Sequence, residues 1–473
     1  MNDLAFMPIT ELSRMLDVGS IDAETLTRTF LDRIRGAGRA LNCFITLCED
    51  TALAEAGAAA ARVASGGRRG LLDGIPVAVK DNIDVAGVPT SNGFGGSPYR
   101  IPDEDAEVVR RLRDAGAVIL GKLNMHEGAL GATNDNPHHG RAINPHRVGH
   151  SPGGSSGGSG AAVAGGLCCA ALGTDTGGSV RIPASYCGIV GLKPSFGLIS
   201  TRGVVPLSHR LDHVGPLARS VADTAAILGV LAGFDRRCAE SRRVPAQRYD
   251  DIQPGRLDGV RLGVIGNFTA ETVDPDVTET FEQALDHLRS LGATIHPITL
   301  PSYDPVRGRR ACFVRVEAEA AFHHGALYAQ APERFSPPMR GYLEYGLRLS
   351  AQQLLIADQR MDLGAGELNA CFVDVDAIVS PTTPQAAPAF DTTPPENAGT
   401  FSVLANFAGC PAISMLMGMN GLGLPLGLQI FGPSHDDRRV LTIAAAYEAA
   451  VKGATTSRPR RLRTELIEEA PTG

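Results

Sequence analysis

The sequence predicts an α/β fold in which helices cover both faces of a largely parallel or mixed sheet. Short strand-like runs alternate with helical stretches from residue 71 onward, which is the pattern of such sheets. The hydrophobic content of 43% is enough for a sizeable core. With 473 residues, the chain exceeds the roughly 250–300 residues at which a single core usually stops growing. We therefore expect either two domains or one wide sheet. The predicted strands are 75–80, 117–120, 168–172, 260–265 and 377–379.

The first 66 residues predict an N-terminal helical layer. Helical periodicity covers residues 9–36 and 50–65, and the second segment is alanine-rich and closes at Gly66-Gly67. Thr10 and Ser20 are the expected N-caps, because a hydroxyl oxygen there can accept a hydrogen bond from a free main-chain N–H. We expect residues 67–473 to form the main body of the protein.

Two segments lack helical or strand periodicity. Residues 381–400 are rich in proline and threonine and predict a long surface loop. Residues 453–473 predict a polar tail.

Composition argues against several classes of partner. The net charge is −7 and no block of like charge occurs, so we expect no direct contact with nucleic acid or with an anionic membrane. No run of about 18 apolar residues and no basic, apolar leader is present. These features favour a cytoplasmic protein that acts on a small molecule.

The cysteines and histidines predict no metal site and no cofactor. Nine cysteines at irregular spacing form no CxxC pair, so disulfides and structural zinc are not expected. We expect Cys168, Cys169 and Cys187 to be small buried apolar groups. His138, His139, His146 and His150 lie in a loop rich in proline and asparagine, without an ordered set of carboxylate ligands. We expect these to be exposed loop histidines, and the pair His323-His324 is interpreted in the same way.

Two serines between glycines, Ser155 and Ser179, predict a hydrolase site. They lie 24 residues apart, and a Gly-Thr-Asp-Thr-Gly-Gly run precedes the second. Without bulky side chains, a substrate can approach such a loop closely, and consecutive main-chain N–H groups can converge on an oxyanion. A serine nucleophile also needs a base.

Lys80 is the candidate base. It ends the apolar run 75–79, so a buried strand would carry its amine to the sheet edge where active sites of open α/β sheets lie. Lysine normally titrates near ~10.4, so a base at neutral pH requires a decrease of about 3 units, which burial can supply. On spacing alone, a solvated lysine at the end of a strand is the commoner arrangement.

Two other motifs compete with this interpretation. Gly153 to Gly157 matches the GxSxG elbow of α/β-hydrolases, which would make Ser155 the nucleophile and require a later Asp and His. The elbow needs a strand directly before it, whereas residues 144–152 are turn-rich and contain two prolines. Residues 116–122 imitate a phosphate-binding loop, but Leu123 replaces the required Ser or Thr. We therefore reject both motifs.

Taken together, the motifs closely resemble the amidase signature family. The resemblance is strong over roughly residues 70–235, and the middle, about 240–370, is the variable part. It is carried by residues 74–87, 121–127, 151–159, 173–184 and 188–194, and resumes at 377–384, 404–414 and 421–430.

The resemblance implies a site built around a Ser-Ser-Lys relay. In that site Ser179 is the nucleophile, Ser155 relays the proton and follows a cis peptide bond from Gly154, and Lys80 is the final base. Asp175 and Arg181 hold the loop that carries the nucleophile. Ala129 and its neighbours line the acyl side of the pocket. The implied oxyanion donors are the main-chain N–H groups of Thr176, Gly177, Gly178 and Ser179, and the implied neighbours of Ala129 are Gly128, Leu130 and Gly131.

The same resemblance implies one large mixed sheet of about eleven strands covered by helices on both faces. Residues 67–473 would be the amidase signature domain, and with the layer 1–66 they would form one structural domain. Homodimers are common in the family, so a homodimer is expected.

The expected activity is hydrolysis of a small carboxamide to a carboxylate and ammonia or an amine by a standalone enzyme. Two alternatives stay open: the glutaminase subunit of a tRNA-dependent amidotransferase, which works with partner subunits, and a biuret-type or carbamoyl amide hydrolase. The amidotransferase subunit usually carries a stretch like SSNLARYDGVRYG, where this chain has residues 316–328, and an acidic residue at about Gly399. The chain lacks the first, and Glu396 is out of register for the second. A non-catalytic scaffold is disfavoured because Lys80, Ser155 and Ser179 are all present.

Overall fold

The computed structural model describes residues 4–266 and 272–451, so the predicted tail at 453–473 lies outside the described residues. Within them, eleven strands form a single mixed sheet. The strands are β1 (Phe44–Leu47), β2 (Pro76–Lys80), β3 (Val118–Leu123), β4 (Ala170–Asp175), β5 (Val190–Lys193), β6 (His213–Ala218), β7 (Arg261–Ile265), β8 (Thr294–Ile298), β9 (Ala377–Pro381), β10 (Ala412–Met419) and β11 (Pro425–Phe431).

Helices cover both faces of this sheet, as predicted. In one group, α5 packs mainly on β4, and α6 packs on β5, β10 and β11. In a second group, α7 packs on β5 and β6, and α8 and α13 pack on β10 and β11, with α13 in contact with both α7 and α8. The helices are α1 (Ile9–Asp17), α2 (Ala23–Arg35), α3 (Glu49–Ala64), α4 (Glu107–Asp114), α5 (Gly157–Ala164), α6 (Arg181–Cys187), α7 (Val221–Leu231), α8 (Pro275–Ser290), α9 (Pro305–Gln330), α10 (Pro337–Arg348), α11 (Ala351–Cys371), α12 (Val403–Phe407) and α13 (Asp437–Val451).

The order of the strands places chain segments far apart in sequence side by side. It runs β1-β3-β2-β4-β6-β5-β10-β11-β9-β7-β8. β2 pairs in parallel with both β3 and β4, and β7 pairs in parallel with β8 and β9. The carboxyl ends of β2 and β4 therefore lie next to each other, which is where open α/β sheets bind ligands.

The N-terminal layer differs from the prediction in its details. The periodic segment 9–36 is two helices, α1 and α2, separated at Gly19, whose φ of 66° favours glycine. Thr10 and Ser20 do not cap them: Thr10 lies inside α1, which follows Pro8, and Asp22 caps α2 by accepting from the Thr25 N–H at 2.7 Å. The layer also contains β1, the edge strand next to β3, which the helical periodicity did not predict.

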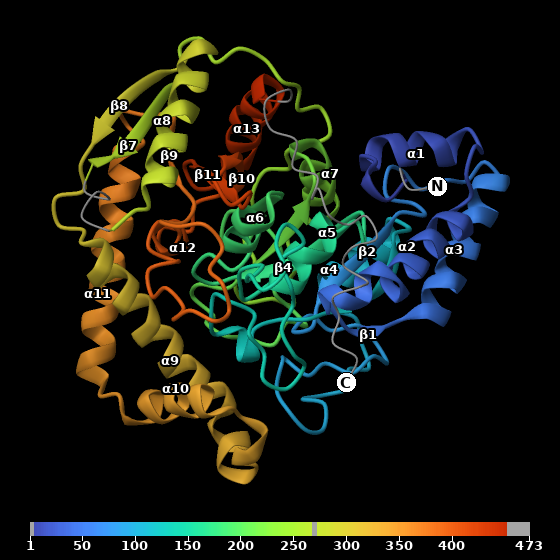
Figure 1. Cartoon of the computed structure of the whole chain (residues 1–473), viewed down its shortest axis with the longest axis horizontal. Helices are drawn as coiled ribbons and strands as arrows, with labels where there is room; N and C mark the ends of the chain where they lie inside the picture. Colours follow the sequence, from blue (N-terminus) through green and yellow to red (C-terminus); the bar gives the residue numbers. More distant parts are fainter. Residues whose placement is uncertain (1–3, 267–271, 452–473) are drawn as a thin grey trace.

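The two ends of the molecule have different architectures. In Figure 1, α1, α2 and α3 gather at one end, and α9, α10 and α11 stand at the opposite end. The latter three pack on one another and, with α12, enclose a second hydrophobic core centred on residues such as Phe335, Leu343 and Leu404.

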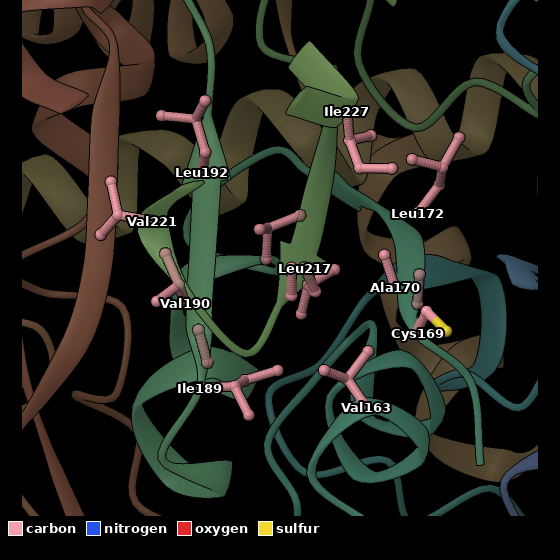
Figure 2. Close-up of a cluster of buried hydrophobic side chains, with 14 of the residues drawn as sticks. Val163, Cys169, Ala170, Leu172, Ile189, Val190, Leu192, Leu217, Val221 and Ile227 are labelled. Carbon is pink, nitrogen blue, oxygen red and sulfur yellow. The ribbon is translucent and has the colours of Figure 1, made fainter. Parts of the chain in front are cut away.

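The main core lies between the central strands and their helices. Figure 2 shows side chains of β4, β5 and β6, such as Leu172, Leu192 and Leu217, meeting Val163 of α5 and Ile227 of α7. Cys168, Cys169 and Cys187 are fully buried, as predicted. Among the described helices, none is both long and apolar enough to cross a membrane.

The predicted loop 381–400 contains no helix and no named strand beyond its first residue, as expected. It is not wholly on the surface: Thr382, Thr383, Ala387 and Ala398 are buried. The burial arises because the loop runs between β11, α6 and the cavity described below rather than over solvent.

Candidate active site

Lys80 is buried at the end of β2 and is not a solvated lysine. Its side chain is 0% exposed, and its Nζ donates to Ser155 Oγ at 2.7 Å and to Thr174 Oγ1 at 2.8 Å. Thr174 is on β4, the parallel neighbour of β2, and Ser155 lies directly before α5. The peptide bond between Gly154 and Ser155 is cis. The fold thus joins two of the predicted catalytic residues by a direct hydrogen bond.

The surroundings of Lys80 favour a neutral amine. Burial lowers its pKa to about 7, while the negative charges of Asp212 and Asp175 act in the opposite direction. Desolvation disfavours the charged form of a lysine in this way. The amine can therefore accept a proton near neutral pH.

Ser179 is half-buried in the turn that joins β4 to α6, and it faces a cavity. Gly178 has a φ of 124°, and a Cβ there would overlap Ser402, so only glycine fits. Within the described part of the chain, the main-chain N–H groups of Thr176, Gly177 and Ser179 have no acceptor, whereas the Gly178 N–H donates to Asp175 Oδ1 at 2.8 Å. Three of the four predicted oxyanion donors are thus free to bind a ligand.

A buried ion pair between Asp175 and Arg181 holds this turn. Both side chains are 0% exposed, and Arg181 donates to the two Asp175 oxygens at 2.9 and 3.0 Å. Burial alone would raise the pKa of Asp175, but the guanidinium reverses the effect, and the net shift is downward. Arg181 also donates to the Ser402 carbonyl, Gln429 Oε1 and Asn406 Oδ1.

A cavity of about 940 Å³ opens beside Ser179. Apolar side chains line most of it, and they come from the segment 129–132, from α9 and α10, and from the chain before α12. Ala129, Leu130 and Gly131 contribute to the lining. Gly128 does not: a Cβ there would meet Met339 and Phe94 instead.

Asp212 is a half-buried site residue that the sequence reasoning missed. It accepts from Thr176 Oγ1 at 2.6 Å and from the Leu207 and Ser208 N–H groups at 2.8 and 3.0 Å. Burial raises its pKa to about 6. Its position just before β6 was the available signal, because an acidic residue beside a buried strand must find partners.

His126 and the α9 wall of the cavity were also missed. His126 lines the cavity, its main-chain N–H donates to the Ser155 carbonyl, and burial lowers its pKa to about 4. From α9 come Cys312, Val316 and Glu317. The variable middle of the chain, which carries no motif, supplies this wall.

The histidines expected to be exposed are instead bonded within the structure. His138 contacts Glu127 at 3.0 Å, His139 the Phe94 carbonyl at 3.1 Å, and His146 the Cys187 carbonyl at 2.9 Å. His324 is fully buried in α9 against Phe94 and Tyr99. The prediction was wrong because these segments fold back onto the body of the protein. In the described ranges no group of three or more His, Cys, Asp or Glu side chains could hold a metal ion.

Comparison with known proteins identifies the family. The Amidase family model matches residues 25–441 of this chain. The chain belongs to the amidase signature family. The predicted family and the predicted sheet of about eleven strands are thereby confirmed.

The relatives of this amidase differ in their named activities. It is 35% identical to a glutamyl-tRNA(Gln) amidotransferase component from Thermosynechococcus vestitus, over 93% of this chain and 97% of that protein. It is 32% identical to the peptide amidase of Stenotrophomonas maltophilia, with a TM-score of 0.83 over 94% and 97% of the two chains. A structure described as a vestigial complex that reveals the origins of an s-triazine catabolic enzyme is 33% identical, with a TM-score of 0.89 over 96% and 100%. The family membership supports amide hydrolysis.

Proposed function

We propose that this amidase hydrolyses a small carboxamide on its own through a Ser-Ser-Lys relay. The observation that carries the proposal is the buried Lys80 amine, 2.7 Å from Ser155 Oγ, with a pKa lowered to about 7. A neutral lysine in contact with a serine can receive its proton, which a solvated lysine near pH 7 cannot do.

The chemistry runs through an acyl-enzyme on Ser179. Its Oγ attacks the amide carbonyl carbon, and its proton passes to Ser155 as the proton of Ser155 passes to Lys80. When the tetrahedral intermediate collapses, the C–N bond breaks and the leaving nitrogen takes a proton back from Ser155, which Lys80 restores. Water then attacks the acyl-enzyme by the same relay and releases the carboxylate.

The oxyanion would be held by the main-chain N–H groups of Thr176, Gly177 and Ser179. Their lack of an acceptor in the described part of the chain supports this assignment. Since the Gly178 N–H is bonded to Asp175, we assign Gly178 to the shape of the turn rather than to the oxyanion. One such donor typically contributes about 2.7–4 kcal/mol to transition-state stabilisation.

The glutaminase component of a tRNA-dependent amidotransferase is the second candidate, because two glutamyl-tRNA(Gln) amidotransferase A subunits are 35% identical to this chain over nearly its whole length. In that role the enzyme would release ammonia from glutamine for partner subunits. The absence of the SSNLARYDGVRYG-like stretch and of an acidic residue at Gly399 favours the standalone enzyme. Hydrolysis of a biuret-type or carbamoyl amide is a third candidate within the same chemistry.

Ammonia release by the purified chain tests the proposal. The panel is glutamine, asparagine, and aliphatic, aryl and carbamoyl amides. We expect turnover of an amide that is not an amino acid, and a decrease of at least about a thousandfold in kcat/KM in Ser179→Ala and Lys80→Ala. Ser159→Ala is the matched control: Ser159 also lies between glycines and is buried, but its Oγ donates to the Leu172 carbonyl. Activity on glutamine alone, and only with partner subunits, would favour the second candidate.

We further propose that the enzyme is cytoplasmic and forms a homodimer. Light scattering on the purified chain and fractionation of cells that produce it test the two statements separately.

A further inference from the structure

Four acidic residues line the active-site cavity, and they differ in how their carboxylates are bonded. Glu127 accepts from the Ser336 N–H and Oγ and contacts His138. Asp135 is paired with Arg141. Glu396 is exposed on its loop. Glu317 is buried, with a side chain that is only 5% exposed. Its nearest donor, Arg310, lies 3.4 Å away.

The bonding of Glu317 leaves acceptor capacity unused. Its two oxygens each lie 3.4 Å from Arg310 Nη1, and in the described ranges these are its hydrogen bonds. A carboxylate offers about four lone-pair sites, and charge-assisted bonds are normally about 2.7–2.9 Å long. Burying a carboxylate with such weak partners is costly. A ligand that donates hydrogen bonds would remove this cost.

The two arginines near the cavity, Arg309 and Arg310, have other groups that stabilise their charges. Arg310 is 49% exposed and stacks over the Tyr345 ring at 4.9 Å, so water and the ring stabilise its charge. Arg309 donates to Thr400 Oγ1 at 2.6 Å. Among these charged side chains of the cavity wall, the unmet hydrogen-bonding capacity is therefore that of an acceptor.

We propose that Glu317 binds an amino or ammonium group on the acyl part of the substrate, so that the enzyme prefers carboxamides that carry such a group. This inference rests on the proposed function and adds a substrate class to it. The rest of the cavity lining is largely apolar, which suits a hydrocarbon linker between the ammonium and the amide. Burial raises the pKa of Glu317, with Arg310 acting against the shift, and a bound cation would favour the ionised carboxylate.

Matched pairs of amides test the inference. Glycinamide, β-alaninamide, 4-aminobutanamide and 6-aminohexanamide are each compared with the amide in which a methyl group replaces the ammonium. We expect kcat/KM to favour the amino compound by about tenfold to a hundredfold at one chain length. Glu317→Gln should abolish that preference, measured as the ratio of kcat/KM between the two members of a pair. Glu344→Gln removes a charge outside the cavity, at a residue bonded to Tyr328, and should keep the preference.

Two results would overturn the inference. One is the absence of a preference for the amino compound at every length, and the other is a preference that survives Glu317→Gln. Succinamic acid is included as a carboxylate-bearing amide, and a preference for it would assign recognition to Arg310 instead.

A second variant separates recognition from folding. Glu317→Asp keeps the charge and withdraws it by one methylene, so the preferred amino amide should become one methylene longer. A merely structural role of Glu317 predicts no such change in substrate length.

A binding measurement tests this inference independently of hydrolysis and therefore of the proposed function. In Ser179→Ala, calorimetry with the same pairs should show tighter binding of the amino compound, lost when Glu317→Gln is added. If the wild type hydrolyses neither these pairs nor any amide of the panel above, the proposed function fails while this measurement still decides the inference. Equal binding of both members would reject the inference even if hydrolysis occurs.

Discussion

Lys80, which is buried, and Asp212, which is half-buried, titrate close to each other. The pKa of Lys80 is lowered to about 7 and that of Asp212 is raised to about 6, in both cases mainly by burial. Asp212 also accepts from Thr176 Oγ1, so it joins the base to the turn that carries the nucleophile. The negative charge of Asp212 acts on the pKa of Lys80 in the direction opposite to burial.

The expected pH profile follows from the lowered pKa of Lys80. The proposed mechanism requires neutral Lys80, which is the form present above its pKa. We therefore expect kcat/KM to rise with pH through about 7. The midpoint of this rise gives the pKa of Lys80 in the free enzyme. The measurement is kcat/KM for one amide between pH 5 and 9. A profile that is flat over this range would contradict the assignment of Lys80.

Asp212→Asn should move that profile. Its carboxylate opposes the effect of burial on Lys80, so its removal lowers the lysine pKa further and shifts the acidic limb to lower pH, by about one unit. The maximal rate should also fall, since an amide cannot accept from Thr176, Leu207 and Ser208 together. The shift distinguishes an electrostatic role from loss of structure, which would lower the rate and leave the limb in place.

At the scale of elements, Arg181 ties the turn after β4 to segments far along the chain. Arg181→Ala leaves the Asp175 carboxylate buried and unpaired, which typically costs about 3–5 kcal/mol of stability. We expect a large decrease in the unfolding midpoint in denaturant, together with loss of activity. Arg14→Ala serves as control: Arg14 and Glu11 are 62% and 42% exposed, and this pair should contribute nothing measurable. Equal midpoints for the two variants would contradict the anchoring role.

The predictable elements were those with strong local patterns. β2 is buried along its whole length, as parallel strands are, so its apolar run stood out. β1 has four half-buried residues and β6 contains Gly215 and Pro216, so neither carries a strand pattern of its own. The prediction of Thr10 and Ser20 as N-caps was wrong because Pro8 and Asp22 stand at the N-cap positions of α1 and α2.

The same contrast applies to the site. Lys80, Ser155 and Ser179 lie in motifs that contain glycines, and at several of these glycines the local packing leaves no room for a side chain. Glu317 belongs to a helix whose sequence shows no clear apolar face, and its role depends on how α9 packs against α10 and the cavity. Such a residue can be identified only after the packing is known.

At the scale of the whole molecule, buried neutral histidines make stability depend on pH. Burial, with His323 as a smaller cause, lowers the pKa of His324 to about 3, against about 6.5 in the unfolded chain. The unfolded state then binds more protons between these values. Stability from this group is complete above about pH 6.5 and is lost as the pH falls toward 3.

His324→Phe should flatten this dependence. A phenyl ring can keep the contacts with Phe94 and Tyr99, and it does not titrate. We expect the slope of the unfolding free energy between pH 4 and 6 to decrease by up to about 1.4 kcal/mol per pH unit. His296→Phe, at an exposed position, should leave the slope as in the wild type, and the same slope in both variants would contradict the prediction.

The contacts of Arg181 can form only after most of the chain has been synthesised. Its partners Ser402, Asn406 and Gln429 lie more than two hundred residues after it, and β10 and β11 insert between β5 and β9, which precede them in the chain. A nascent chain still tethered before residue 430 can contain Lys80, Ser155 and Ser179 and yet lack the groups that position their turn. We therefore expect a chain that ends before residue 429 to be inactive, because it lacks Gln429, a partner of Arg181.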